Sequence, residues 1–260
     1  MAAVKKLETK EKVSDAGSGA GPKPFHRLTL SSMASGRCLG LVGGLGVGAT
    51  IHYYRKLAEA HEAQGRSLNI VIANAETSRV FAHVQKTDRD GLAEYLIGFI
   101  QRLQAAGATL AAIPAVTPYY CARELTAASP IPVIDIFQPL IDELARKQIR
   151  RVSVFGTRFV IESDLFGFVK DVEIVHAMPA EVDTIHQVYV ELARRGEGSP
   201  EERQAITDLA KALVKREQLD AIVLAGTDFS SIFSDSNPDF PAVDCAELHI
   251  RTIVHRLLAA

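Results

Sequence analysis

Short apolar runs alternate with longer amphipathic segments from residue 38 onward. Runs rich in Val, Ile and Leu and bounded by Gly, Pro, Asn or Asp are typical of buried strands, and apolar positions three or four residues apart are typical of helices. The pattern predicts strands at residues 38–43, 68–74, 108–114, 131–135, 151–156, 172–176, 220–226 and 241–244. It predicts helices at residues 50–64, 89–106, 118–128, 137–148, 161–170, 181–196, 200–218 and 245–258. This alternation indicates an α/β protein with parallel sheets.

Two stretches of the chain share a plan. "LQAAGATLAAIPAVT" (103–117) and "VKREQLDAIVLAGTD" (214–228) both contain the end of an amphipathic helix, a connector, an apolar strand and a turn with Thr. Two such halves, each an open parallel sheet, would place two strand ends opposite each other across a cleft. The two stretches share an order of predicted elements but little sequence identity. A closed barrel of βα units therefore remains an alternative at this point.

The N-terminal residues 1–36 differ from the rest of the chain. They are rich in Lys, Glu, Ser, Gly and Ala and carry no sustained apolar period. Such a composition buries too little apolar surface to offset the entropy of ordering. We therefore predict a disordered N-terminal extension.

Composition and charge exclude several classes of protein. With 260 residues, 47% hydrophobic and 23% charged, the chain can bury a sizeable core. Its 29 basic and 31 acidic residues give no cationic surplus for nucleic acid. No stretch of about 18 apolar residues predicts a membrane span, and no signal-peptide core follows the first basic residues. Cys38, Cys121 and Cys245 lack disulfide or zinc spacing, so we expect no metal and a cytoplasmic location.

A glycine-rich turn follows the first predicted strand. Its order, "GGLGVG" at residues 43–48, differs from the dinucleotide-binding GxGxxG, and no phosphate-binding Lys follows it. The turn alone therefore predicts no nucleotide cofactor.

Several ordered segments together resemble one known family. "LGLVGGLGVGATIHYYRKL" (39–57) has a Gly-Gly turn and then a Thr-initiated helix bearing Tyr-Tyr-Arg. "VSVFGTRFVIESDLFG" (152–167) keeps the spacing of a Gly-Thr-Arg segment with an acidic and an aromatic residue further on. "VEIVHAMPAEVDTIHQVYVEL" (172–192) and "FPAVDCAELHIRTIV" (240–254) extend the match. The chain thus resembles the aspartate/glutamate racemase family, and most of all its broad-specificity amino-acid racemase branch.

The resemblance implies two Rossmann-like domains with parallel sheets, related by a pseudo-twofold axis, with the substrate in the cleft between them. The implied domains are residues 37–138 plus 241–260, and residues 139–240. The resemblance also implies a homodimer that needs neither pyridoxal phosphate nor metal. One thiol from each domain would exchange a proton with the carbon next to the substrate carboxylate.

Both thiol positions are substituted in this chain. By resemblance, the first catalytic position is Ala115, and the positions of the family's Asn and His hold Val116 and Tyr119. The second is Thr227, followed by Asp228. A racemase needs a base and an acid on opposite faces of one carbon, and a methyl group supplies neither. We therefore expect the two-thiol racemization to be lost.

Other residues are candidates for a remaining site. Thr227, Asp228 and Tyr119 could act in catalysis, although Asp228 could instead cap its own turn and Tyr119 could be a packing residue. Cys121, one helical turn after Thr117, could be recruited or simply buried. Thr117 and the amides beside it form a plausible anion cradle. Substrate-binding positions are predicted at Gly44, Asn74, Val116, Thr117, Thr157, Arg158 and Glu162.

Three functions stay open from the sequence. The first is an enzyme acting on an amino acid or related carboxylate by altered chemistry, as an isomerase, decarboxylase or lyase. The second is an inactive racemase homologue that binds an amino-acid-like anion. The third, a structural or interaction protein, rests only on the N-terminal extension.

Overall fold

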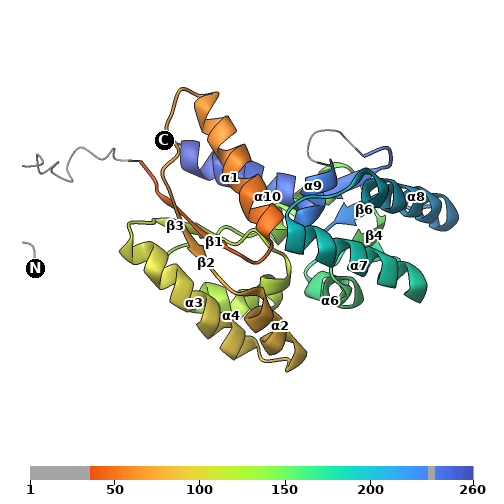
Figure 1. Ribbon diagram of the computed structural model, residues 1–260, viewed down its shortest axis with the longest axis horizontal. Coiled ribbons are helices and arrows are strands. Elements are labelled where there is room, and N and C mark those ends of the chain that lie inside the picture. Colours follow the sequence, from red (N-terminus) through yellow and green to blue (C-terminus); the bar gives the residue numbers. More distant parts are fainter. Residues whose placement is uncertain (1–35, 234–237, 260) are drawn as a thin grey trace, which may run out of the picture. The chain divides into compact units, whose positions relative to one another are not determined.

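The computed structural model describes residues 36–233 and 238–259 (Figure 1). The predicted extension at residues 1–36 lies outside the described residues except for Gly36. Within them, helices alternate with parallel strands, which confirms the predicted α/β class. None of the helices in these ranges has the length and apolar character that a membrane span requires.

The first sheet contains three parallel strands. These are β1 (Leu39–Gly43), β2 (Ile70–Asn74) and β3 (Leu110–Ala112), in the order β2-β1-β3. The strand expected at residues 131–135 is reduced to an isolated parallel bridge between Ala111 and Val133. The bridge places Val133 beside β3, on the side away from β1.

The second sheet contains four parallel strands. These are β4 (Arg151–Phe155), β5 (Glu173–Ile174), β6 (Ala221–Leu224) and β7 (Ala242–Asp244), in the order β5-β4-β6-β7. In both sheets the second strand along the chain lies on one side of the first, and the third lies on the other. The described strands therefore form two open sheets of similar order, and the closed barrel was the wrong alternative.

The helices occur largely where the sequence predicts them. They are α1 (Val47–Glu62), α2 (Thr77–Gln85), α3 (Arg89–Ala105), α4 (Ala122–Ala128), α5 (Phe137–Arg146), α6 (Arg158–Glu162), α7 (Pro179–Arg195), α8 (Pro200–Glu217), α9 (Ser230–Phe233) and α10 (Cys245–Leu258). Short 3-10 turns are η2 (Thr117–Cys121), η3 (Asp164–Gly167) and η4 (Thr227–Phe229). Helices α2 and α9 were not expected from the sequence.

The helix predicted over residues 161–170 is interrupted. Asp164, Leu165 and Phe166 have φ angles of 51°, 54° and 60°. Left-handed backbone at non-glycine residues cannot continue a right-handed helix. The segment therefore divides into α6 and η3.

The two faces of the first sheet are covered by different helices. Leu39 and Leu41 on β1 point to one face and pack in a cluster with residues of α1 and α10. The opposite face is covered by α3 (Figure 1). A Cβ atom at Gly40 would lie 2.9 Å from Leu103 Cβ, so this glycine lets α3 pack closely on β1.

The C-terminal segment joins both halves. The predicted division assigned residues 241–260 to the first domain. Strand β7 of this segment pairs with β6 in the second sheet, while α10 packs against α1 and α5. The described residues from Gly36 onward belong to one compact unit. The domain boundaries therefore stay a prediction.

Candidate functional site

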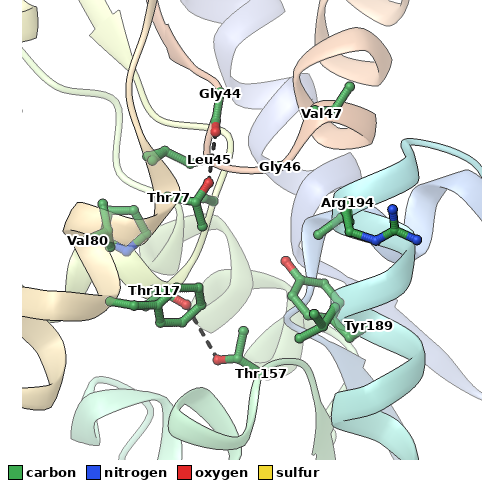
Figure 2. A pocket seen from close by; sticks show the side chains of 15 residues that line it. Gly44, Leu45, Gly46, Val47, Thr77, Val80, Thr117, Thr157, Tyr189 and Arg194 are labelled. Carbon is green, nitrogen blue, oxygen red and sulfur yellow. Dashed lines mark hydrogen bonds between the residues drawn. The ribbon is translucent and has the colours of Figure 1, made fainter.

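A cavity of about 410 Å³ lies where β1, β3 and β4 end (Figure 2). Its wall comes from six places: the turn after β1, the first residue of α1, helix α2, the turn after β3, the turn after β4, and helix α7. Most of the lining side chains are apolar or small. The lining residues are Gly44, Leu45, Gly46, Val47, Thr77, Val80, Phe81, Ala115, Thr117, Pro118, Thr157, Tyr189, Val190, Ala193 and Arg194.

Threonine hydroxyls supply much of the polarity of the cavity. Thr117 Oγ1 and Thr157 Oγ1 are 3.5 Å apart, and each follows a strand of a different sheet (Figure 2). Thr77 Oγ1 donates a hydrogen bond of 2.9 Å to the carbonyl oxygen of Gly44. The Thr117–Thr157 contact therefore brings the two halves together at the cavity.

Backbone amides beside these hydroxyls have free donors. The N–H groups of Ala115, Thr117 and Thr157 donate to no other residue in the described part of the chain. Amides at the beginning of a helical turn lack intrahelical partners and favour an anion. The amides and hydroxyls at Thr117 and Thr157 can therefore accommodate a carboxylate.

Among the described residues that line the cavity, only Tyr189 carries an ordinary acid/base group. Of the described residues that line it, none is Cys, His, Asp, Glu or Lys. Arg194 is the one charged residue among them, and its guanidinium donates to Glu191 Oε2 at 2.7 Å. Figure 2 shows this guanidinium pointing away from Thr117 and Thr157. The described lining thus offers hydroxyls and backbone amides rather than thiol, imidazole or carboxyl groups.

Thr227 and Asp228 lie behind the wall and do not line the cavity. Thr227 is buried, and its hydroxyl donates a 3.0 Å hydrogen bond to the carbonyl oxygen of Pro114. Asp228 is 0% exposed. Its Oδ1 accepts from Ala49 N at 2.8 Å, and its Oδ2 accepts from the Tyr189 hydroxyl at 3.1 Å. The side chains of both candidates are therefore already engaged in hydrogen bonds within the protein.

Asp228 caps a helix that is remote in sequence. Helix α1 begins after Gly46, which has no side chain to cap it, and the Asp228 carboxylate accepts from the third amide of that helix. A Cβ atom at Gly46 would lie 2.2 Å from Asp228 Oδ2, and one at Gly48 would lie 3.1 Å from Oδ1. The two glycines leave the space that this carboxylate fills. The Asp228 side chain therefore does cap a backbone amide, but that amide belongs to α1 and not to its own turn.

Burial controls the protonation of this group. It raises the pKa of Asp228 to about 6, although the hydrogen bonds from Ala49 and Tyr189 and the nearby His52 oppose the shift. The pKa of Tyr189 lies well above its usual value, first because of burial and then because of the Asp228 charge. At neutral pH Asp228 is therefore mostly ionised and Tyr189 is protonated.

Tyr119 lies away from the cavity. Its side chain is buried, and its hydroxyl donates to the carbonyl oxygen of Ile134 at 2.8 Å. Its ring makes edge contacts with Phe137 and His249. These contacts are those of a packing residue, and a catalytic role for Tyr119 stays an untested prediction.

The cysteines have the environment of buried residues. Cys121 is fully buried, and burial raises the pKa of its thiol to about 12. Cys38 and Cys245 are also buried and unpaired. No cysteine of the described residues lines the cavity.

The predicted substrate-binding set is only partly brought together. Gly44, Thr117 and Thr157 line the cavity, whereas Val116 is buried in the core. Asn74 is exposed; its oxygen would lie 2.5 Å from a Cβ atom at Gly44, whose φ is +81°.

Arg158 and Glu162 pair with each other at 3.0 Å outside the lining, and Arg158 also pairs with Asp183. The binding roles of all these residues stay predictions.

Sequence reasoning missed part of the wall. Helix α2 supplies Thr77, Val80 and Phe81, but it was not predicted as a helix. Tyr189 follows the buried spacing of α7, which predicts a core position and does not reveal the partner of its hydroxyl. Only the approach of α7 to η4 identifies that partner as Asp228.

Comparisons with known proteins agree with this architecture. A putative Asp/Glu racemase from Yersinia pestis superposes with a TM-score of 0.70 at 21% identity, covering 85% of this chain and 99% of that chain. An aspartate racemase homologue from Pyrococcus horikoshii OT3 gives 0.69 at 20% identity, covering 85% and 99%. A glutamate racemase isoform from Bacillus anthracis gives 0.58 at 16% identity, covering 86% and 82%. Likeness at these identities shows the shared fold.

The family assignment comes from the sequence match. No curated protein sequence matches the chain. The family model described as Asp/Glu/hydantoin racemase matches residues 42–253, which is most of the chain. The chain therefore belongs to the Asp/Glu/hydantoin racemase family.

Proposed function

We propose that this chain binds a small amino acid or related carboxylate in the cavity and does not racemize it by two thiols. The observation that carries the proposal is the lining, which has no thiol, imidazole or carboxyl group among the described residues. Inversion at a carbon next to a carboxylate needs a base on one face and an acid on the other. The Thr and Tyr189 hydroxyls and the apolar side chains present can bind a ligand but do not supply both a base and an acid at neutral pH.

The two positions that correspond by resemblance to the catalytic thiols support this proposal. Ala115 lines the cavity and presents a methyl group. Thr227 donates its hydroxyl to Pro114, the residue before Ala115. The hydroxyl is therefore engaged by the opposite strand end and does not face the cavity.

The polar and apolar parts of the cavity suggest how a ligand is held. A carboxylate would accept hydrogen bonds from the amides and hydroxyls at Thr117 and Thr157. The apolar part of the ligand would lie against side chains such as Val80, Phe81 and Val190. This role requires neither a metal nor pyridoxal phosphate.

One observation favours a second candidate, an isomerase, decarboxylase or lyase with a single acid/base group. The Tyr189 hydroxyl donates to Asp228, and Tyr189 lines the cavity. A pKa of about 6 at Asp228 lies close to the range useful for a general base. In this candidate, the Tyr189 hydroxyl would pass its proton to the Asp228 carboxylate while the Tyr189 oxygen takes a proton from the ligand, and the reverse transfer would return the proton.

Binding and solvent exchange distinguish the candidates. Purified protein would be titrated calorimetrically with amino, hydroxy and dicarboxylic acids, and the same mixtures in D₂O would be followed by proton NMR. We expect binding without loss of the α-proton signal and without product. Thr117→Val should weaken the binding. Exchange or turnover that disappears in Tyr189→Phe would instead establish the second candidate.

We also propose a cytoplasmic homodimer, because the family resemblance implies a dimer and the cysteines of the described residues are unpaired. Light scattering coupled to size exclusion measures the mass directly. A monomer at micromolar concentration contradicts this part of the proposal.

A further inference from the structure

We infer that Asp228 determines ligand specificity: its carboxylate occupies the amino end of α1 as an internal anion and makes the cavity reject ligands with a second carboxylate. The inference rests on the proposed binding of a small amino acid or carboxylate. It goes beyond that proposal because it states which charge class is bound.

The first step concerns the amino end of α1. This end carries free amides and the positive end of the helix dipole, which together attract anions. Gly46 offers no side-chain cap there. Asp228 Oδ1 instead accepts from Ala49 N at 2.8 Å. The Asp228 carboxylate thus occupies the amino end of α1, which could otherwise bind a carboxylate of the ligand.

The second step concerns the position of this charge relative to the cavity. Gly46 and Tyr189 both line the cavity, and both contact Asp228 from the other side. Figure 2 shows Tyr189 near the Gly46 turn. The carboxylate therefore lies directly behind the wall, where little water screens it, since Asp228 is 0% exposed.

The third step concerns positive charge in the lining that could offset the charge of Asp228. Arg194 is the charged residue among the described lining residues, and Glu191 already pairs with it. A ligand with a net negative charge therefore meets a repulsive wall, whereas a zwitterion can direct its ammonium group toward that wall. Relatives named for aspartate and glutamate suggest dicarboxylates for those proteins. The structure instead assigns monocarboxylic amino acids with neutral side chains to this chain.

A matched pair of ligands tests the inference. Norvaline and glutamate have the same main-chain length and differ by one carboxylate, so their affinities for the full-length protein would be compared by calorimetry. We expect norvaline to bind at least about tenfold more tightly than glutamate, as expected for like charges in a poorly screened site. In Asp228→Asn, which keeps an acceptor for Ala49 N, that ratio should fall by about tenfold. An unchanged ratio in a folded variant overturns the inference.

Tyr189→Phe is the control. It removes the hydroxyl that contacts Asp228 but keeps the charge behind the wall. We expect this variant to retain the preference for norvaline, although the absolute affinities can change. If Tyr189→Phe loses the preference as fully as Asp228→Asn, packing rather than charge sets the selectivity and the inference is wrong.

The pH profile supplies a readout that a merely structural role would not change. The titratable groups facing Asp228 are Tyr189 from α7 and His52 from α1. Burial raises the pKa of Asp228 to about 6, so the wall loses its charge below that pH. The preference for norvaline should decline between about pH 8 and about pH 5, where the glutamate side chain stays ionised. Asp228→Asn should show no such decline, and equal profiles contradict the inference.

The removed carboxylate can also be replaced from solution. In Asp228→Ala, formate should raise the melting temperature relative to equal chloride, and it should have no such effect on the unsubstituted protein. This measurement needs no bound amino acid. Failure of all panel ligands to bind removes the proposed function and the specificity that rests on it but leaves the internal anion standing, whereas absence of a formate effect overturns the internal anion itself.

Discussion

The turns after β3 and β6 occupy corresponding places in the two sheets but have different environments. Thr117, after β3, lines the cavity, and its hydroxyl is 3.5 Å from that of Thr157. Thr227, after β6, is 1% exposed and donates to the carbonyl oxygen of Pro114. Its neighbour Asp228 holds the amino end of α1. Equal topology therefore did not give equal environments: the turn after β3 lines the cavity, and the turn after β6 is buried behind the wall.

The physical difference is the partner that each hydroxyl finds. A hydroxyl whose partner lies across a cavity can exchange that partner for a ligand. A buried hydroxyl that donates to a backbone carbonyl cannot do so without leaving that carbonyl unpaired, at a cost of about 1 to 3 kcal/mol. The contrast makes three predictions, which differ in the size of the expected effect.

The largest effect is expected when the space behind the wall is filled. In Gly46→Ala the new Cβ atom would lie 2.2 Å from Asp228 Oδ2, so the carboxylate must move away from Ala49 N. We expect unfolding free energy to fall by about 3 kcal/mol, measured by urea denaturation. The control Gly98→Ala adds the same methyl group where nothing lies within 4 Å, in the interior of α3. It should be neutral or stabilising by about 0.5 to 1 kcal/mol.

A double substitution tests whether the clash with Asp228 causes this loss of stability. Because the clash is with Asp228, Gly46→Ala should cost much less in an Asp228→Gly background than in the unsubstituted chain. Equal costs in the two backgrounds would show that the turn after β1, and not its contact with the turn after β6, resists the methyl group.

A smaller effect is expected from pH. Burial raises the pKa of Asp228 to about 6, above its usual value, so the folded chain binds this proton more tightly than the unfolded chain does. Stability from this group is therefore fully present below the unfolded pKa and is lost as pH rises through about 6. Relative to Asp228→Asn, the protein should lose about 2 kcal/mol of unfolding free energy between about pH 4 and about pH 7.

The comparison with Asp228→Asn isolates one group. Asp244, whose pKa burial also raises to about 6, is present in both proteins and cancels in the difference. Parallel stability curves for the two proteins would mean that Asp228 is not the group that titrates.

The smallest effects come from exchanging each hydroxyl for a methyl group. Thr227→Val leaves Pro114 O without its donor, so we expect a loss of about 1 kcal/mol in stability with little change in ligand affinity. Thr117→Val should change stability by less than about 0.5 kcal/mol and weaken ligand binding several-fold. Denaturation and calorimetry on the same samples measure both quantities. The reverse assignment of the two effects would overturn the proposed difference between the turns.

Much of the fold could be predicted from the sequence, because apolar periodicity is a local signal. Strands β1, β4 and β6 and helices α3, α7, α8 and α10 occur close to their predicted positions. Helix α2 was missed because it is only 9 residues long and buries only Val80 and Val84, so the periodic signal extends over few positions. The segment at 131–135 has a strand-like composition, but its pairing is limited to the bridge at Val133.

The site was less predictable. The family resemblance indicated Gly44, Thr117 and Thr157, and the expected helix start also indicated Thr117; all three line the cavity. The chain pattern gave no indication that Thr77 and Tyr189 would join them. Arg158 and Glu162 fit the family motif but pair with each other outside the cavity lining.

The sequence by itself determined the α/β class, the resemblance to the racemase family, and the presence of Ala115 and Thr227 at the expected catalytic positions. These are properties of residue type and spacing along the chain. Only the tertiary structure decided that Asp228 caps α1 and that Thr227 bonds to Pro114. Hydrogen-bond partners and burial depend on segments remote in sequence that fold against each other, and local periodicity carries no information about those pairings.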